Sequence, residues 1–297
     1  MKVLRTPEER FSDLPDYPFN PHYEELSGYE GLRFHYIDEG PQDAEHVFLC
    51  LHGEPTWGYL YRKMIPVFTR AGYRAIAPDF FGFGRSDKPA EEAVYTFDFH
   101  RMSIMAFIEQ LDLTNITLVC QDWGGLIGLT LPMDMPGRIS RFLIMNTMLA
   151  TGDEPLSKGF LDWRDWNNQH PDMAVGTLIG RACPHLSKAE CAAYDAPYPD
   201  ATYKAGVRRF PNIVPDNTDA PGAALSRRAR AWFRALWTGQ TFMAIGMRDP
   251  VLGPPVMNHL KQSIRGCPEP CEMDEAGHFV QEWGQKVAVQ ALKSFGK

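Results

Sequence analysis

The fold is decided by ITLVCQDWGGL, residues 116–126, where an apolar run leads into a polar turn and then into two glycines. Ile116–Cys120 predicts a buried strand, because short continuous apolar runs are typical of strands covered on both faces. An apolar helix is expected from about Leu126. Asp122 stands at the tip of the turn between them, where a strand, a sharp turn and a helix expose one reactive side chain. The stretch therefore predicts a nucleophile elbow with Asp122 as the nucleophile.

Strands and helices alternate on both sides of this stretch. Apolar runs predict further strands at Val47–Leu51, Arg74–Pro78 and Thr241–Gly246. Helical spacing of apolar residues covers Leu60–Ala71 and Phe99–Leu113. This alternation predicts an α/β fold with a mostly parallel sheet flanked by helices.

The edges of the sheet and an insertion complete the expected organisation. Residues 23–26 and 32–36 predict an antiparallel hairpin at the sheet edge, and residues 282–295 a closing helix. Residues 149–223 break the rhythm, because they are rich in Trp, Tyr, Asp and Pro and contain no clear strand. We therefore expect a core from 1–148 and 224–297, interrupted by a helical cap domain at 149–223.

Composition narrows the function classes. The 297 residues are 44% hydrophobic and carry 37 acidic against 30 basic side chains, a net charge of -7 with no basic cluster, which argues against nucleic acid as a partner. No apolar stretch predicts a signal peptide or a membrane span. Six cysteines in a chain of this length are expected to be reduced thiols, which predicts a cytoplasmic protein. The pair Cys267 and Cys271 has no second pair at zinc-site spacing, so no metal or cofactor is expected.

Two further residues complete a catalytic set with Asp122. Asp249 follows the strand predicted at 241–246, and His278 lies near the C-terminus. Each alone has a simpler structural explanation, as a helix cap or a structural histidine. Together they follow the order nucleophile, acid, histidine of the α/β-hydrolases, and residues 52–55 (HGEP) follow the first parallel strand, where backbone donors for an oxyanion are expected.

Nearly the whole chain resembles the haloalkane dehalogenases, in particular the subfamily with a short helical cap. The resemblance rests on six stretches, HGEPTW (52–57), QDWGG (121–125), GFLDW (159–163), FP (210–211), MAIGMRD (243–249) and GHFVQE (277–282). It implies that Asp122 is the nucleophile, Asp249 the acid and His278 the base.

The resemblance also implies the binding groups. The backbone N–H groups of Glu54 and Trp123 would form the oxyanion hole, and the indoles of Trp123 and Trp163 would hold the halide. The expected pocket lining is Leu126, Phe160, Phe210, Pro211, Val214, Val251 and Leu252. The implied substrate is a short haloalkane, hydrolysed to a primary alcohol, halide and proton. We expect a monomer with no membrane partner.

The chemistry explains why an aspartate would replace the usual serine. A haloalkane has no carbonyl, so serine attack would leave a stable ether, whereas carboxylate attack leaves an ester that water can cleave. A carboxylate is ordinarily ionised at neutral pH and needs no base for the first step. A histidine such as His278 is needed only to activate water for the second step.

Two other functions stay open at this level. An epoxide hydrolase shares the fold, the Asp nucleophile and often the Asp-Trp-Gly triplet, but needs an acid for the leaving alkoxide, and Tyr194, Tyr198 and Tyr203 are candidates in the cap. A non-catalytic receptor on a hydrolase scaffold would be expected to lack a triad member. Trp163 stands three residues from Trp166, so the two indoles would equally fit simple packing on one helix face.

Overall fold

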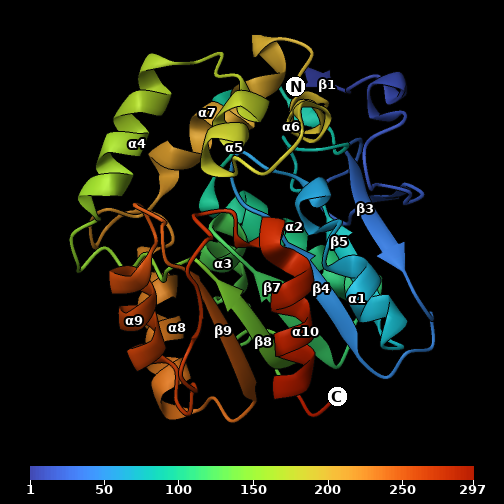
Figure 1. Ribbon diagram of the computed structural model, residues 1–297. Coiled ribbons are helices and arrows are strands. Elements are labelled where there is room, and N and C mark those ends of the chain that lie inside the picture. Colours follow the sequence, from blue (N-terminus) through green and yellow to red (C-terminus); the bar gives the residue numbers. More distant parts are fainter.

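The computed structural model describes all residues 1–297 and is organised around one eight-stranded sheet (Figure 1). The strand order is β10-β9-β8-β7-β4-β5-β3-β2. The six strands from β10 to β5 pair in parallel, and β3 and β2 add an antiparallel edge. Their bounds are β2 His22–Glu25, β3 Arg33–Glu39, β4 Val47–Leu51, β5 Arg74–Pro78, β7 Ile116–Cys120, β8 Ile139–Met145, β9 Gln240–Gly246 and β10 Cys271–Met273, with β1 Val3–Leu4 and β6 Lys88–Pro89 in a small separate sheet.

The strand order places the helices on the two faces of the sheet. The crossover from β4 to β5 runs in one direction, and all later crossovers run in the other; because such connections are right-handed, α1 lies on the face opposite to α2 and α3. The last helix, α10, contacts α1. The bounds are α1 Ile65–Arg70, α2 Phe97–Gln110, α3 Trp123–Gly128, α8 Ala223–Ala235, α9 Pro254–Ser263 and α10 Gly284–Ser294. None of the helices combines the length and hydrophobicity needed to cross a bilayer.

Four helices between β8 and α8 lie above the carboxyl ends of the strands (Figure 1). They are α4 Lys158–Gln169, α5 Val175–Ala182, α6 Lys188–Asp195 and α7 Ala205–Arg209, followed by the 3-10 turn η5 Phe210–Ile213. No strand occurs between β8 and β9. These elements, residues 158–213, are called the roof below, and they form one contiguous segment of the chain.

The predicted strands at 47–51, 74–78 and 116–120 are confirmed to the residue, and the edge hairpin is confirmed with slightly different limits. Strands β8 and β10 escaped the sequence analysis. In the first, the polar pair Ser140 and Arg141 follows Ile139 and interrupts the apolar run, and the second is only three residues long. The helix expected over 60–71 is wrong at its start: Gly58–Tyr61 forms the 3-10 turn η2, and α1 begins at Ile65 because Pro66 suits only the first turn of a helix.

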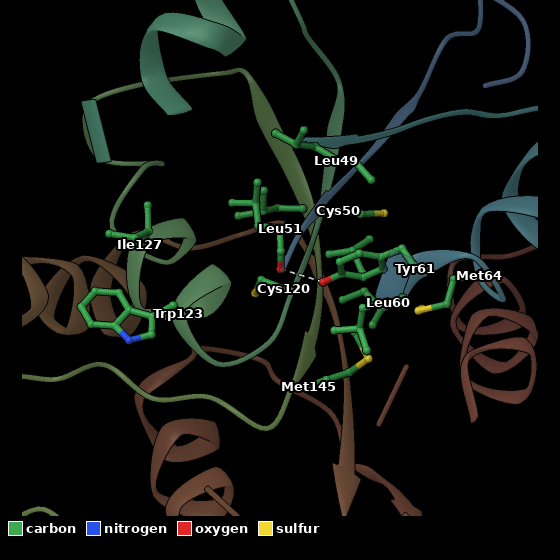
Figure 2. Close-up of a cluster of buried hydrophobic side chains, with 14 of the residues drawn as sticks. Leu49, Cys50, Leu51, Leu60, Tyr61, Met64, Cys120, Trp123, Ile127 and Met145 are labelled. Carbon is green, nitrogen blue, oxygen red and sulfur yellow. Dashed lines mark hydrogen bonds between the residues drawn. The ribbon is translucent and has the colours of Figure 1, made fainter. Parts of the chain in front are cut away.

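The core lies where β4 and β7 meet the turn η2 and helix α3 (Figure 2). Leu51, Cys120 and Tyr61 are completely buried there. The Tyr61 hydroxyl donates a hydrogen bond to the Leu51 carbonyl at 2.7 Å, shown as a dashed line in Figure 2. This bond satisfies a polar group at the end of β4, directly below the loop that carries Glu54.

A buried ion cluster ties the roof to the sheet. The Arg62 guanidinium, after η2, donates to both carboxylate oxygens of Glu282 at 2.7 and 2.9 Å and to Glu190 of α6 at 2.9 Å. Lys63 also bonds Glu282 at 2.8 Å, and the Tyr194 hydroxyl of α6 donates to the same carboxylate. Arg62 and Glu282 have no exposed side-chain surface. This cluster joins α6 to the segment that follows His278.

Candidate active site

Asp122 sits in a backbone conformation that few side chains adopt. Its φ of 51° and ψ of -127° place it in a sharp turn between β7 and α3. The turn is held by a bond from its N–H to the Asn146 carbonyl at 2.9 Å and by the Thr147 hydroxyl, which donates to its carbonyl at 2.7 Å. Gly124 is required, because a Cβ there would come within 2.0 Å of the Leu51 carbonyl oxygen. The strained turn presents the Asp122 carboxylate at the carboxyl edge of the sheet.

Backbone donors from the neighbouring strand meet this carboxylate. The N–H of Glu54, in the loop after β4, donates to Asp122 Oδ1 at 2.8 Å. Trp123 opens α3, so its N–H belongs to the first turn, where backbone donors lack intrahelical acceptors. Gly53 allows the close approach, since a Cβ there would lie 2.3 Å from Asp122 Oδ1. Because β4 and β7 adjoin where the direction of the crossovers reverses, the site occupies the position where open α/β sheets bind ligands.

His278 stands between two carboxylates. Its Nδ1 lies 2.8 Å from Asp249 Oδ2, and its Nε2 lies 3.6 Å from Asp122 Oδ2. The N–H groups of Val251 and Leu252 donate to Asp249 Oδ1 at 2.8 and 3.1 Å. These bonds fix the position of the Asp249 carboxylate, and Asp249 in turn fixes the orientation of the His278 ring.

The electrostatics of the pair follow from these contacts. Burial alone would raise the pKa of Asp249, but the His278 ring, the Asn146 amide and the Val251 N–H hold it below its usual value. Burial would lower the pKa of His278, but Asp249 and Asp122 together outweigh it and raise that pKa to about 10. In the free protein, His278 is therefore more basic than an ordinary histidine.

Glu54 differs from the other carboxyl groups of the site. Burial raises the pKa of its side chain well above the usual value, and the charge of Asp122 raises it further. Its Oε1 is buried without a hydrogen-bond partner. The Glu54 carboxyl group beside Asp122 is therefore harder to ionise than that of an exposed glutamate.

A cavity of about 540 Å³ opens above Asp122 and below the roof. Of the predicted site residues, eleven line it: Glu54, Asp122, Trp123, Leu126, Phe160, Trp163, Pro211, Val214, Val251, Leu252 and His278. Asp249 lies buried behind His278. Phe210, predicted as pocket lining, does not reach the cavity. Its ring packs against Trp123 with centroids 4.6 Å apart and is completely buried.

Several site residues were missed by the sequence analysis. Asn146 donates to Asp249 Oδ2 at 2.8 Å, and Gln121 contacts His278. Asn146 directly follows β8, so recognising that strand would have placed it at the same sheet edge as Asp122. The cavity is also lined by residues that the sequence analysis did not name as part of the site: Pro55, Met148, Leu178, Arg181, Ala182, Pro184, Arg248, Pro250, Glu275, Gly277 and Phe279.

The cap tyrosines that an epoxide hydrolase would need lie away from the cavity. Tyr194 donates its hydroxyl to Glu282, and Tyr198 donates to the Pro55 carbonyl at 3.4 Å. Neither these two nor Tyr203 lines the cavity. Their hydroxyls therefore have no access to a leaving oxygen above Asp122.

Comparisons with known proteins agree with this geometry. A family model described as alpha/beta hydrolase fold matches residues 46–285. A haloalkane dehalogenase of Psychrobacter cryohalolentis is 47% identical over 97% of this chain and 96% of its own, and one of Mycolicibacterium paratuberculosis is 40% identical over 95% and 94%. The solved tetrameric structure of the haloalkane dehalogenase DpaA from Paraglaciecola agarilytica NO2 is 54% identical, covers 100% of this chain and 99% of its own, and superposes with a TM-score of 0.97. The predicted α/β-hydrolase fold is confirmed, and the chain belongs to the haloalkane dehalogenases, hydrolases that act on carbon–halide bonds.

Proposed function

We propose that this protein hydrolyses short haloalkanes to a primary alcohol, halide and a proton through an alkyl ester on Asp122. The observation that carries this proposal is the position of the His278 ring, which bonds Asp249 at 2.8 Å and lies 3.6 Å from Asp122. His278 and Asp122 both line a cavity whose other lining side chains are largely apolar. A carboxylate nucleophile with a separate base supports two successive displacements.

In the first step, one Asp122 oxygen attacks the halogen-bearing carbon, the carbon–halogen bond breaks, and halide leaves with the electron pair. Trp123 and Trp163 both line the cavity, so their indole N–H groups are suited to stabilise the charge that develops on the halide. Neutral donors suit this task because a fixed cation would hold the product ion more tightly.

In the second step, His278 Nε2 takes a proton from water while the water oxygen attacks the ester carbonyl of Asp122. The resulting oxyanion lies beside the Glu54 N–H, which already donates to Asp122 Oδ1 at 2.8 Å. Collapse of this intermediate breaks the C–O bond to the alkyl group's oxygen, and the hydroxyl proton of the intermediate passes to that oxygen, which releases the alcohol and regenerates the carboxylate. His278 then gives the proton it took from water to the solvent. Asp249 stabilises the imidazolium that forms on His278.

The direct test is halide release from a panel of short chloro- and bromoalkanes, measured beside diol formation from styrene oxide. We expect halide release and no diol, because the cap tyrosines lie away from the cavity. Diol formation without halide release would favour an epoxide hydrolase. Release of neither product would indicate a receptor.

Replacing Trp163 with Phe is expected to slow the first step and weaken halide binding. Trp163 packs on Trp166 with ring centroids 5.4 Å apart, and phenylalanine retains most of this packing while removing the indole donor. A donor to a developing anion contributes about 2 to 4 kcal/mol. Stopped-flow halide release and halide quenching of tryptophan fluorescence measure the two effects. Trp166→Phe is the matched control, since Trp166 does not line the cavity. Unchanged rates and halide affinity in Trp163→Phe would leave Trp163 only a packing role.

The two steps are expected to differ in their dependence on pH. Only neutral His278 can accept a proton from water, so ester hydrolysis should slow as the pH falls through the pKa of His278 in the alkyl-enzyme. That pKa should lie below the value of about 10 in the free protein, because esterification removes the Asp122 charge that helps to raise it. The halide burst makes no demand on His278 and should stay nearly flat between pH 5 and 9. A burst and a steady state with the same acid limb would contradict this division of labour.

Three wider expectations belong with this proposal. The monomer expected from the sequence stays a prediction, and the 54% identical Paraglaciecola relative is a tetramer. Sedimentation velocity would measure the oligomeric state of this protein. The six cysteines are unpaired, which supports a reducing, cytoplasmic setting. Residues 149–223 are proposed as a cap domain, supported by the strand-free helical segment above the sheet (Figure 1).

A further inference from the structure

Gln121, the residue immediately before the nucleophile, contacts the base directly. Its amide nitrogen lies 2.8 Å from His278 Nε2 and 3.1 Å from the His278 carbonyl oxygen. The side chain is completely buried. The proposed mechanism assigns the same ring nitrogen to accept a proton from water, so the Gln121 amide and that water compete for Nε2.

The partners of the Gln121 amide fix which way it points. The His278 carbonyl can only accept a hydrogen bond, so the group facing it must be the NH₂. On the other side, the Gln281 amide nitrogen lies 3.4 Å from Gln121 Oε1 and donates to it. A flipped amide would place oxygen against oxygen and nitrogen against nitrogen at these two contacts. The NH₂ group of Gln121 therefore faces Nε2 of His278.

A donor at this position has a consequence for the ring. Nε2 can accept from Gln121 only in the neutral tautomer that carries its proton on Nδ1, where it donates to Asp249. In the imidazolium, an N–H on Nε2 would face the N–H of Gln121, and two donors would oppose one another. We propose that Gln121 holds Nε2 of His278 as an acceptor and so opposes the protonation of the ring that its two carboxylate neighbours favour.

The surroundings of His278 show why such a device is useful. Asp249 follows β9 and Asp122 follows β7, and both favour the imidazolium. The other titratable or charged side chains that line the cavity are Glu54, Arg181, Arg248 and Glu275. A base protonated throughout the neutral range would not activate water, and a general base works best with a pKa near the working pH. Gln121 is thus a positioning residue that lowers the basicity of His278 toward that range.

This inference rests on the proposed function, because it concerns the hydrolysis step assigned to His278. The test uses Gln121→Met, which keeps the length but removes the donor, and Gln121→Glu, which keeps the shape but places a carboxylate beside the ring. In the profile of hydrolysis rate against pH, the acid limb should move to a pH about one unit higher in Gln121→Met. This is the usual effect of losing one hydrogen bond that stabilises only one protonation state of a group. The acid limb should move at least as far in Gln121→Glu.

The curve of hydrolysis rate against pH for Gln121→Met should then cross the curve for the unmodified protein. At pH 7 ester hydrolysis should be about tenfold slower, while above the shifted limb it should equal or exceed the original rate, because a more basic ring accepts the proton more readily. The halide burst should change by less than about threefold, since alkylation does not use His278. A loss of hydrolysis that is uniform over all pH values would overturn the inference in favour of a structural role.

A measurement without turnover separates this inference from the proposed function. In protein labelled with ¹⁵N-histidine, with His278 assigned from the spectrum of His278→Gln, the midpoint of its ring titration should rise in both Gln121 variants. Thr117→Val is the matched control, because Thr117 is buried on β7, the strand that Gln121 directly follows, and its hydroxyl has no partner. An unmoved midpoint would overturn the inference even if halide release is found. A moved midpoint without any halide release would support the inference and contradict the proposed function.

Discussion

His278→Gln should stop turnover while still releasing one equivalent of halide per active site. Alkylation consumes the charge of Asp122 and makes no demand on the histidine, whereas ester hydrolysis has no other base beside Asp122. The steady-state rate should fall by about 10⁴-fold or more, as in hydrolases that lose a triad member. Mass spectrometry of the intact variant after exposure to 1,2-dibromoethane should show one bromoethyl adduct, and peptide mapping should place it on Asp122.

The controls for this experiment come from the nucleophile and from a neighbouring thiol. Asp122→Ala should give neither halide nor adduct. Cys120 lies two residues before Asp122 and is completely buried, and burial raises the pKa of its thiol, so it should remain unmodified. A variant without stoichiometric halide, or with its adduct on Cys120, would contradict the assignment of Asp122 as nucleophile.

Arg62→Met should have the largest effect on stability. The Arg62 guanidinium bonds Glu282 and Glu190, and its removal leaves these two carboxylates close together with only Lys63 as a nearby cation. Removing one partner of a buried ion pair typically costs about 3 to 5 kcal/mol. Urea unfolding of the variant should show a lower midpoint by a corresponding amount. Lys158→Met is the control, because the Lys158–Asp162 pair is exposed and should contribute less than about 1 kcal/mol.

The pH dependence of stability distinguishes this mechanism from simple loss of packing. In the unmodified protein, burial would raise the pKa of Glu282, but Arg62 and Lys63 hold it below its usual value. Its contribution to stability is therefore lost as the pH falls through that lowered pKa. Without Arg62 the pKa should rise, so the destabilisation should be larger at pH 8 than at pH 5. The double variant Arg62→Met/Glu282→Leu removes both charges and should recover much of the loss. An equal loss at both pH values, without recovery in the double variant, would assign the effect to packing.

The sequence predicts most of the sheet and the position of the proposed catalytic set, for a physical reason. Strands such as Ile116–Cys120 are buried on both faces, so nearly every residue is apolar and the run can be recognised from the sequence alone. Asp122, Asp249 and His278 each follow such a run or close the expected order of residues. The strands that were not predicted lack this signal, since Ser140 and Arg141 interrupt the apolar run of β8 near its start and β10 has only three residues.

Contacts between side chains could not be predicted from the sequence, and the reason is a different one. Phe210 is as apolar as a pocket residue should be, yet it supports the Trp123 ring from behind, and only the path of the chain decides which side it occupies. The Gln121 contact with His278 depends on the direction of one amide, set by two partners far away in sequence. Residue type and spacing carry no information about either arrangement.

The contiguous roof has a consequence for how new substrate ranges arise. The proposed reacting groups come from the loops that follow β4, β7 and β9, together with His278, whereas Phe160, Leu178 and Val214 come from the single segment between β8 and α8. Most of the proposed reacting groups are therefore encoded outside the stretch that supplies the roof, and Trp163, a proposed halide donor, is the exception. Recombination among relatives would exchange the whole roof at once if the breakpoints lay near residues 149 and 223. The carboxylates and the histidine below it would stay in place. The exchanged segment must still match the core at many contacts. They include the bond from the Trp57 indole to the Ala193 carbonyl, the packing of Phe210 on Trp123, and the contacts of α6 with Arg62.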